Sequence, residues 1–149
     1  MQNTDSVGAL LRDKAPTIHS ITTTATVLDA ITLMAERNIG ALPVMRGGQL
    51  VGMLTERDYT RKVILMGRTS RDTQVGEIMT HNPVIVGPGD TVNDCMEIMT
   101  EQRVRHLPVV EDGKLIGILS IGDLVKWIIS AQTATIEHLT RYVFGEQVS

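Results

Sequence analysis

The sequence carries one arrangement of a hydroxyl and a carboxylate twice. Thr55 stands three residues before Asp58, and Ser120 stands three residues before Asp123. A hydroxyl at a helix N-terminus lies beside unpaired N–H groups and a partial positive charge, which suits a phosphate. A carboxylate one turn later can accept hydrogen bonds from two sugar hydroxyls. The arrangement fits recognition of a sugar phosphate, but simple helix capping is the commoner explanation for such a local pattern.

Other patterns that carry catalysis are absent from the sequence. Cys95 is its single cysteine, and the histidines show no i,i+4 pairing, which argues against a metal site. The sequence contains no nucleophile elbow, phosphate-loop lysine or dinucleotide-binding glycine motif. Cys95 falls on the apolar side of a predicted helix, so we expect a buried, inert thiol. We therefore predict no catalytic residue, no metal and no catalytic cofactor.

Both arrangements belong to a longer internal repeat. Residues 26–64 align without a gap with residues 91–129, and both copies contain Leu-Pro-Val followed by Leu-x-Gly-x-Leu. Thr26 and Thr91 are predicted N-caps of amphipathic helices. Each Leu-Pro-Val begins a predicted β-hairpin whose tight turn uses a glycine, and a further helix follows at Thr55 or Ser120. Shorter strands are predicted over residues 17–21 and 83–86.

This order of elements predicts an α/β (α+β) protein made of two pseudo-symmetric βαββα repeats. A small sheet with helices on one side leaves a face exposed, so we expect the two repeats to pack sheet to sheet. The predicted units are residues 5–64 (first repeat), 65–72 (linker), 73–129 (second repeat) and 130–149 (C-terminal amphipathic helix and tail).

The predicted C-terminal helix carries an apolar stripe of Ile136, Leu139 and Val143, and Gly145 is its predicted stop. The stripe fits either a helix that folds back on the repeats or one that packs in a dimer. Arg141 is the only basic residue there, which disfavours a membrane-surface helix.

Composition excludes several classes of function. The net charge is −3, so general nucleic-acid binding through bulk charge is disfavoured. Aromatic residues make up 3% of the chain, too few for base-stacking platforms. No apolar run approaches the roughly 18 residues of a membrane span. The first residues show no secretory signal, and we therefore expect a cytoplasmic protein without membrane contact.

The doubled pattern of Leu-Pro-Val, turn and Leu-x-Gly-x-Leu-[Ser/Thr]-x-x-Asp resembles a pair of CBS domains, known as a Bateman module. The resemblance covers about 120 of the 149 residues. It implies two clefts that bind adenosine ligands: AMP, ADP, ATP or NAD, with S-adenosylmethionine ranked below these. It also implies a homodimer of stacked modules.

The resemblance further implies roles for particular residues. The Asp would hold the ribose hydroxyls, the Ser or Thr would approach the phosphate, and backbone near Leu-Pro-Val would hold the adenine edge. The first expected cleft consists of Thr17, Ile18, Ala41, Leu42, Pro43, Val44, Thr55, Arg57 and Asp58. The second consists of Thr80, Pro83, Val84, Arg103, Arg105, His106, Leu107, Pro108, Val109, Ser120 and Asp123.

The two copies differ in charge beside these motifs. Arg103 and Arg105 precede the second Leu-Pro-Val, and Arg57 is matched by Gly122. These guanidinium groups suit a polyphosphate, although a solvated basic surface explains them as well. His106 either contacts a phosphate or simply caps its strand. We predict that the two clefts differ in affinity.

The leading hypothesis is a regulatory module that binds an adenosine nucleotide and modulates a partner protein or its own dimer. The main alternative is a structural oligomerisation module without a physiological ligand. An enzyme that acts on the bound nucleotide is disfavoured because no catalytic pair is visible. A nucleic-acid binder that uses the basic linker is also disfavoured, and strongly salt-dependent binding would identify it.

Overall fold

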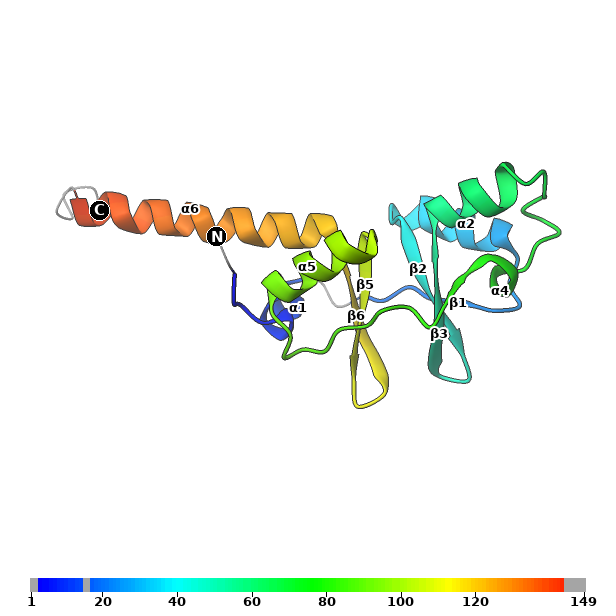
Figure 1. The fold of residues 1–149 in the computed structure, drawn as a ribbon, viewed down its shortest axis with the longest axis horizontal. Coiled ribbons are helices and arrows are strands. Elements are labelled where there is room, and N and C mark those ends of the chain that lie inside the picture. Colours follow the sequence, from blue (N-terminus) through cyan, green and yellow to red (C-terminus); the bar gives the residue numbers. More distant parts are fainter. Residues whose placement is uncertain (1–2, 15–16, 144–149) are drawn as a thin grey trace.

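The computed structural model describes residues 3–14 and 17–143 of the chain. In these residues the chain forms two matched halves, each with a helix, a β-hairpin and a further helix (Figure 1). The first part of the chain contains α1 (Val7–Asp13), β1 (Ile21–Thr22), α2 (Val27–Arg37), β2 (Ala41–Arg46), β3 (Gln49–Thr55), α3 (Glu56–Tyr59) and the π-helix η1 (Thr60–Ile64). The second part contains α4 (Val75–Ile78), β4 (Thr80–His81), α5 (Val92–Gln102), β5 (His106–Glu111), β6 (Lys114–Ser120) and α6 (Ile121–Val143).

The matched helices α2 and α5 begin as the sequence predicts. The Thr26 side chain accepts a hydrogen bond from the N–H of Asp29, and Thr91 accepts one from Asp94. Both helices end at a residue in the left-handed conformation, Asn38 or Arg103, each with a φ of 54°. The two helices therefore begin and end in the same way in both copies, although the left-handed residue at the end of α5 is an arginine.

The predicted hairpins are confirmed. Strands β2 and β3 pair antiparallel, as do β5 and β6, and each pair has one bulge at the end of its Leu-Pro-Val segment. The turns require left-handed backbone, which Gly48 and Gly113 supply with φ of 77°. The paired strands bring residues 41 and 55 opposite each other, and likewise residues 106 and 120.

The predicted leading strands are wrong in length. Of residues 17–21, only Ile21 lies in a strand, where β1 pairs parallel with β2. Residues 83–86 form no strand, and Val86 makes a single bridge with Val109. Both segments cross from one half to the other, so they cannot pair along their length, and Pro83 has no N–H to donate. The resulting sheets have the orders β1-β2-β3-β4 and β5-β6 among the described residues.

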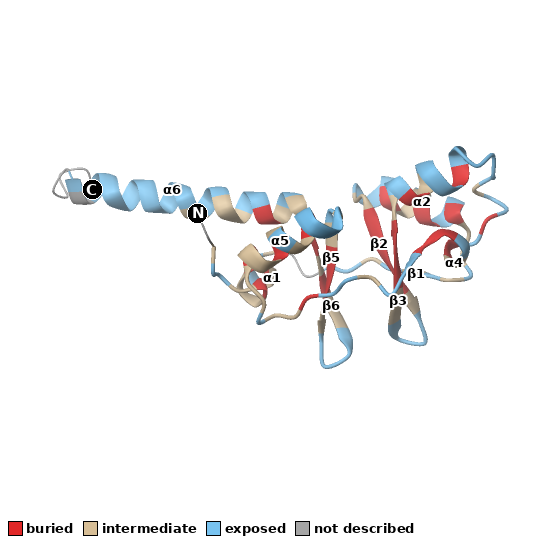
Figure 2. Cartoon of the chain, in the orientation of Figure 1, coloured by how far each residue is buried: buried red, intermediate tan, exposed pale blue. Residues whose placement is uncertain are grey.

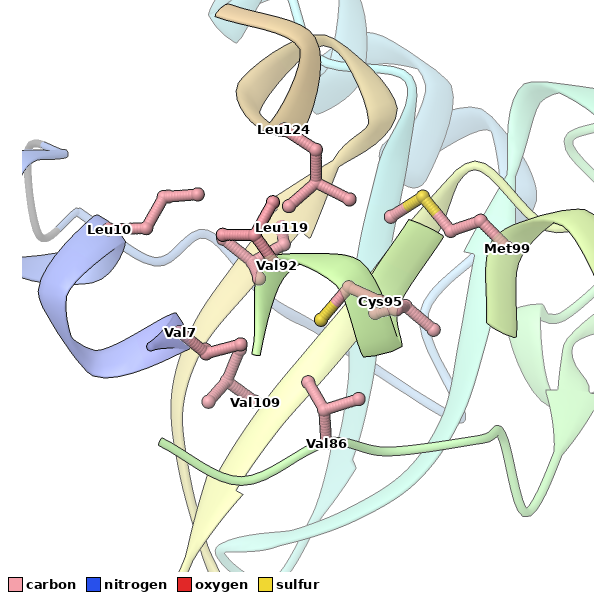
Figure 3. Close-up of a cluster of buried hydrophobic side chains, with 10 residues drawn as sticks. Val7, Leu10, Val86, Val92, Cys95, Met99, Val109, Leu119 and Leu124 are labelled. Carbon is pink, nitrogen blue, oxygen red and sulfur yellow. The ribbon is translucent and has the colours of Figure 1, made fainter. Parts of the chain in front are cut away.

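The two halves exchange their leading helices. Val7 and Leu10 of α1 are buried with Val92, Leu119 and other residues of the second half (Figure 3). In the same way, Val75 and Ile78 of α4 are buried in the core of the first half. The repeat boundaries seen in the sequence therefore differ from the bodies that fold together, and each core needs residues from both repeats.

Cys95 lies in the core of the second half and is fully buried. Burial, together with the nearby carboxylates Asp90 and Asp94, raises the pKa of its thiol to about 11. The expected burial of Cys95 is confirmed, and the raised pKa disfavours the reactive thiolate.

Helix α6 is a single helix from Ile121 to Val143. The predicted second helix of the repeat and the predicted C-terminal helix are thus continuous, because no glycine or proline interrupts residues 123–143. The helix projects past the body of the molecule and is largely exposed there (Figures 1 and 2). The predicted stop at Gly145 lies outside the described residues. Within the described residues, no helix combines the length and the apolar character needed to cross a membrane.

Candidate functional site

Asp58 sits at the N-terminus of α3, at the point where β3 ends. Its carboxylate Oδ2 accepts hydrogen bonds from the Thr55 N–H at 2.9 Å and the Thr55 hydroxyl at 3.1 Å. The Thr55 hydroxyl oxygen in turn accepts from the Asp58 N–H. The other carboxylate oxygen, Oδ1, lies 3.1 Å from the Lys62 ammonium one turn later. The capping interpretation is therefore confirmed at this position, and Asp58 is held buried in one orientation.

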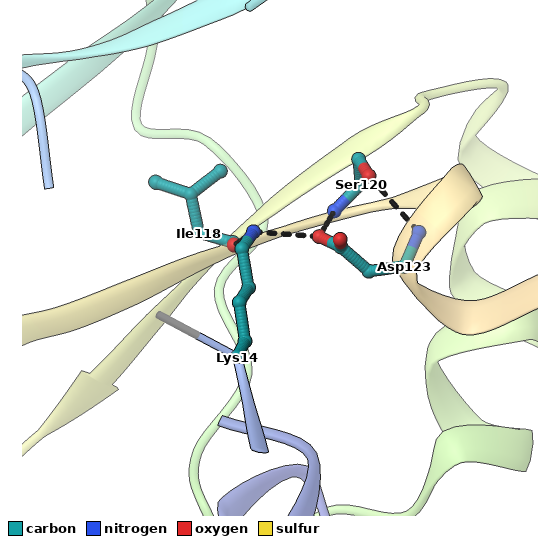
Figure 4. Close-up of polar contacts among 4 residues, drawn as sticks. All are labelled: Lys14, Ile118, Ser120 and Asp123. Carbon is teal, nitrogen blue, oxygen red and sulfur yellow. Dashed lines mark hydrogen bonds and ion pairs between the residues drawn. The ribbon is translucent and has the colours of Figure 1, made fainter. Parts of the chain in front are cut away.

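Asp123 occupies the matched place at the start of α6. Its Oδ2 accepts from the Ser120 N–H at 2.8 Å and from the Lys14 ammonium at 2.6 Å (Figure 4). Lys14 also donates to the carbonyl oxygen of Ile118 at 2.7 Å. Burial by itself would raise the pKa of Asp123, but the hydrogen bonds from Lys14 and Ser120 outweigh it and hold this pKa below its usual value. A lysine from the N-terminal segment thus neutralises this carboxylate.

Asp123 faces a cavity of about 460 Å³, which we call the Asp123 cavity. Its lining combines elements of both halves of the chain. Among its lining residues are Lys14, Thr17, Ile18, His19, Gly40, Ala41, Pro43, His106, Ser120 and Asp123. Its size lies within the range of about 300–1,000 Å³ that small-molecule pockets commonly have.

A second cavity, of about 610 Å³, lies beside Asp58, and we call it the Asp58 cavity. Three guanidinium-bearing residues line it, namely Arg57, Arg103 and Arg105, against the carboxylates of Glu56 and Asp58. The Arg57 guanidinium donates to the carbonyl oxygen of Arg103 at 3.4 Å, which ties the two halves together. The remaining lining residues are Gly40, Met53, Thr55, Thr80, Asn82, Pro83, Val84, Gln102, Val104 and His106.

Gly40 and His106 line both cavities and so lie between them. A Cβ at position 40 would lie 3.5 Å from the His106 ring, an ordinary van der Waals distance, so the two residues adjoin each other. Burial lowers the pKa of His106, and the positive charges of Lys14 and Arg105 act in the same direction, whereas Asp123 opposes them. These effects favour the neutral imidazole, which donates one hydrogen bond and accepts another.

The predicted grouping of residues into clefts is wrong. Thr17, Ile18, Ala41 and Pro43 lie with Ser120 and Asp123, not with Asp58. Correspondingly, Thr80, Pro83, Val84, Arg103 and Arg105 lie with Thr55, Arg57 and Asp58. His106 lines both cavities, so its predicted place with Ser120 and Asp123 is confirmed. The reason is geometric, because β3 and β6 contact each other at the centre of the molecule and direct each Asp toward the other repeat. Each cavity therefore combines the Asp of one repeat with the strand segments of the other.

Some predicted residues line neither cavity. Four of them are buried in the cores, since they alternate with the cavity-facing positions of their strands, whereas Pro108 is buried on the same side of β5 as His106. These residues are Leu42, Val44, Leu107, Pro108 and Val109. A role for their backbone groups stays a prediction.

Lys14 is the residue that sequence reasoning missed. It lies outside the aligned part of the repeat, and its partner Asp123 is 109 residues away. Only the exchange of leading helices brings the two together. The sequence indicates this role of Lys14 only by the presence of a basic residue just before the first predicted strand.

Comparisons with a family profile and with known proteins indicate the same family. A profile of the CBS domain matches residues 8–64 and 75–130. The mitochondrial CBS domain-containing protein CBSX3 of Arabidopsis thaliana is 42% identical over 129 residues, which cover 83% of this chain and 63% of that protein. CBS domain-containing protein YhcV of Bacillus subtilis is 33% identical over 117 residues, covering 78% of this chain and 83% of that protein. The chain spans just under two thirds of the Arabidopsis protein.

Solved structures agree. A CBS-domain protein from Burkholderia ambifaria superposes with a TM-score of 0.83 at 50% identity, covering 85% of this chain and 96% of that one. A hexameric CBS-CP12 protein from bloom-forming cyanobacteria superposes with a TM-score of 0.73 at 28% identity, covering 82% of this chain and 71% of that one. The fold is that of a tandem CBS module. The chain belongs to the CBS domain family, whose paired domains are generally regulatory, ligand-binding modules.

Proposed function

We propose that the chain is a regulatory module that binds an adenosine nucleotide (AMP, ADP, ATP or NAD) in one or both cavities and has no catalytic activity. The observation that carries this proposal is the placement of a hydroxyl and an aspartate together at each cavity, at the start of a helix. A ribose needs a carboxylate acceptor, and a phosphate needs N–H donors and positive charge.

The charges around the cavities support a phosphorylated ligand. The Asp58 cavity carries Arg57, Arg103 and Arg105, which suit several phosphate oxygens. The Asp123 cavity carries Lys14, a single ammonium that already has a carboxylate partner. We expect the Asp58 cavity to favour the more highly phosphorylated nucleotide, so that the two cavities differ in affinity.

The regulatory part of the proposal rests on the composition of each cavity. Both cavities take residues from both repeats, so a ligand contacts the two halves at once. A ligand shifts an equilibrium between arrangements only by its differential affinity for them, and contacts to both halves provide that difference. The output would pass to a partner protein or to a homodimer of stacked modules, in the cytoplasm. One relative is named as hexameric and another as mitochondrial.

One observation favours the alternative, a structural module without a physiological ligand. Both aspartates already have partners inside the protein, Lys62 for Asp58 and Lys14 for Asp123. A ribose would have to share or displace these ammonium groups.

Thermal unfolding of nucleotide-free protein distinguishes the two functions. The additives are AMP, ADP, ATP, NAD and S-adenosylmethionine, with adenosine as the phosphate-free control. A ligand at 100 times its dissociation constant adds about 2.7 kcal/mol to the free energy of unfolding. We expect an upward shift of the melting temperature for at least one nucleotide and a smaller shift for adenosine. If no compound shifts the melting of folded protein, the structural alternative holds.

A further inference from the structure

The outer part of α6 presents an apolar face to solvent. Ile129 is 56% exposed, Ile136 64%, Leu139 55% and Val143 71%. These residues begin beside the body of the molecule and continue past it along the projecting helix (Figures 1 and 2). Large aliphatic side chains in a continuous exposed row indicate an interaction surface. We call this row the α6 stripe and include Val125, its first residue, which is 42% exposed.

The spacing of the α6 stripe is that of a coiled coil. Residues 125, 129, 132, 136, 139 and 143 follow one another at alternating steps of four and three. Apolar residues at such steps occupy the a and d positions of a heptad, which face a parallel partner helix or an antiparallel one. Gln132 is the single polar member of the series. An ordinary core-facing stripe is broader, and in α6 that role belongs to Leu124 and Ile128, which pack on the second core.

The charges of α6 permit a like helix to approach. The positions that flank a heptad seam are e and g, and here they carry Lys126, Ile128 and uncharged threonines. The charged side chains Glu137 and Arg141 lie on other sides of the helix. Two copies of this face therefore meet with little repulsion, because like charges at e and g are what exclude homotypic pairs.

The protein's own body cannot cover the α6 stripe. The helix runs without a break for 23 residues, about 34 Å at the usual rise per residue. Folding back would need a bend, and residues 123–143 contain no glycine or proline to supply one. Of the stripe, only its first residues lie alongside the body.

We propose that the α6 stripe is an interface between two copies of this chain, which pair through their α6 helices as a short coiled coil. The occupant is a second copy because the heptad series is self-complementary and Lys126 is the one charged residue at its flanking positions. This pairing is separate from nucleotide binding and from any stacking of the modules.

The test is sedimentation equilibrium of the full chain and of two variants. Ile136→Glu places a charge within the α6 stripe, and Ala134→Glu places the same charge on the same helix outside it. Both positions are exposed, so neither variant disturbs the core. We expect the wild type to self-associate and Ile136→Glu to raise the dissociation constant by on the order of tenfold or more, with Ala134→Glu unchanged. The fluorescence of Trp127 and far-UV circular dichroism confirm that each variant is folded.

Several results would overturn the proposal. Sedimentation of the wild type as the 16.3 kDa monomer at every concentration tested would be one. Equal association of Ile136→Glu and Ala134→Glu would be another, because it would place the contact elsewhere on the module. Binding of a monomeric wild type to phosphatidylserine-containing vesicles, lost in Ile136→Glu, would assign the stripe to a lipid surface instead.

Discussion

At the scale of single residues, the protein uses each helix-capping aspartate for more than capping. Asp58 and Asp123 both hold the start of a helix, and both also pair with a lysine, of which Lys14 lines a cavity and Lys62 does not. The two lysines come from different places, since Lys62 lies one turn later in η1 and Lys14 comes from the segment after α1. The cavities are therefore related by the repeat but are not electrostatically equal.

The ion pair of Lys14 with Asp123 predicts a pH-dependent contribution to stability. The pKa of Asp123 is lowered in the folded protein, so this contribution is present above the ordinary pKa of about 3.9 and is lost as the pH falls through the lower folded-state value. The two side chains are 36% and 25% exposed, which limits the pair to about 1 kcal/mol at neutral pH.

Urea unfolding of Lys14→Met measures this contribution. We expect the variant to lose about 1 kcal/mol near pH 7 and less near pH 3, because pH 3 lies below the ordinary pKa of about 3.9, where the contribution of the lowered Asp123 pKa is already declining. Lys114→Met, at the exposed first residue of β6, serves as the control. An equal loss at both pH values would show that Lys14 acts through packing alone.

At the scale of elements, the two hairpins differ in how tightly their central glycines are covered. A Cβ at Gly52 of β3 would lie 2.8 Å from the carbonyl oxygen of Thr80 in β4, and 2.6 Å from the Met79 sulfur. A Cβ at the matched Gly117 of β6 would meet only the side chain of Leu11, at 2.7 Å. The Thr80 carbonyl belongs to backbone held in a sheet, whereas the Leu11 side chain can change its rotamer to make room.

This difference predicts unequal effects for one substitution at matched positions. Gly52→Ala should destabilise the protein by about 2–3 kcal/mol, because it overpacks against backbone. Gly117→Ala should cost less than half as much. Urea unfolding of the two variants compares them directly, and equal losses would contradict the packing described for β3 and β4.

The elements that sequence reasoning predicted well are those fixed by local interactions. Thr26 and Thr91 determine where helices begin, and Gly48 and Gly113 determine where the hairpins turn. The leading strands were predicted too long because residues 17–20 cross between the halves, which depends on where α1 packs. The predicted assignment of residues to the two cavities was wrong for the same reason, since no local pattern shows that Asp123 and Thr17 line one cavity.

At the scale of the whole molecule, the exchange of α1 and α4 joins the halves into one folding unit. Each core contains a helix from the other repeat, so neither half can unfold while leaving the other core complete. Trp127, the only tryptophan, packs against the second core and reports on that half alone.

Val75→Ala tests this coupling. Val75 is fully buried in the first core, and its truncation should cost about 2 kcal/mol. We expect the urea midpoint followed by Trp127 fluorescence to fall together with the midpoint followed by circular dichroism. A fluorescence midpoint that stays at the wild-type value would mean that the halves unfold independently.

The central claim is that each cavity uses the aspartate of one repeat to hold an adenosine nucleotide against the other. Isothermal titration of nucleotide-free protein with AMP and ATP tests it most directly, with Asp58→Asn and Asp123→Asn as variants that keep the side-chain shape. We predict binding to the wild type, with Asp58→Asn weakening ATP more than AMP, since the arginines line that cavity. Binding that neither variant changes, or no binding to folded wild type, would contradict the account.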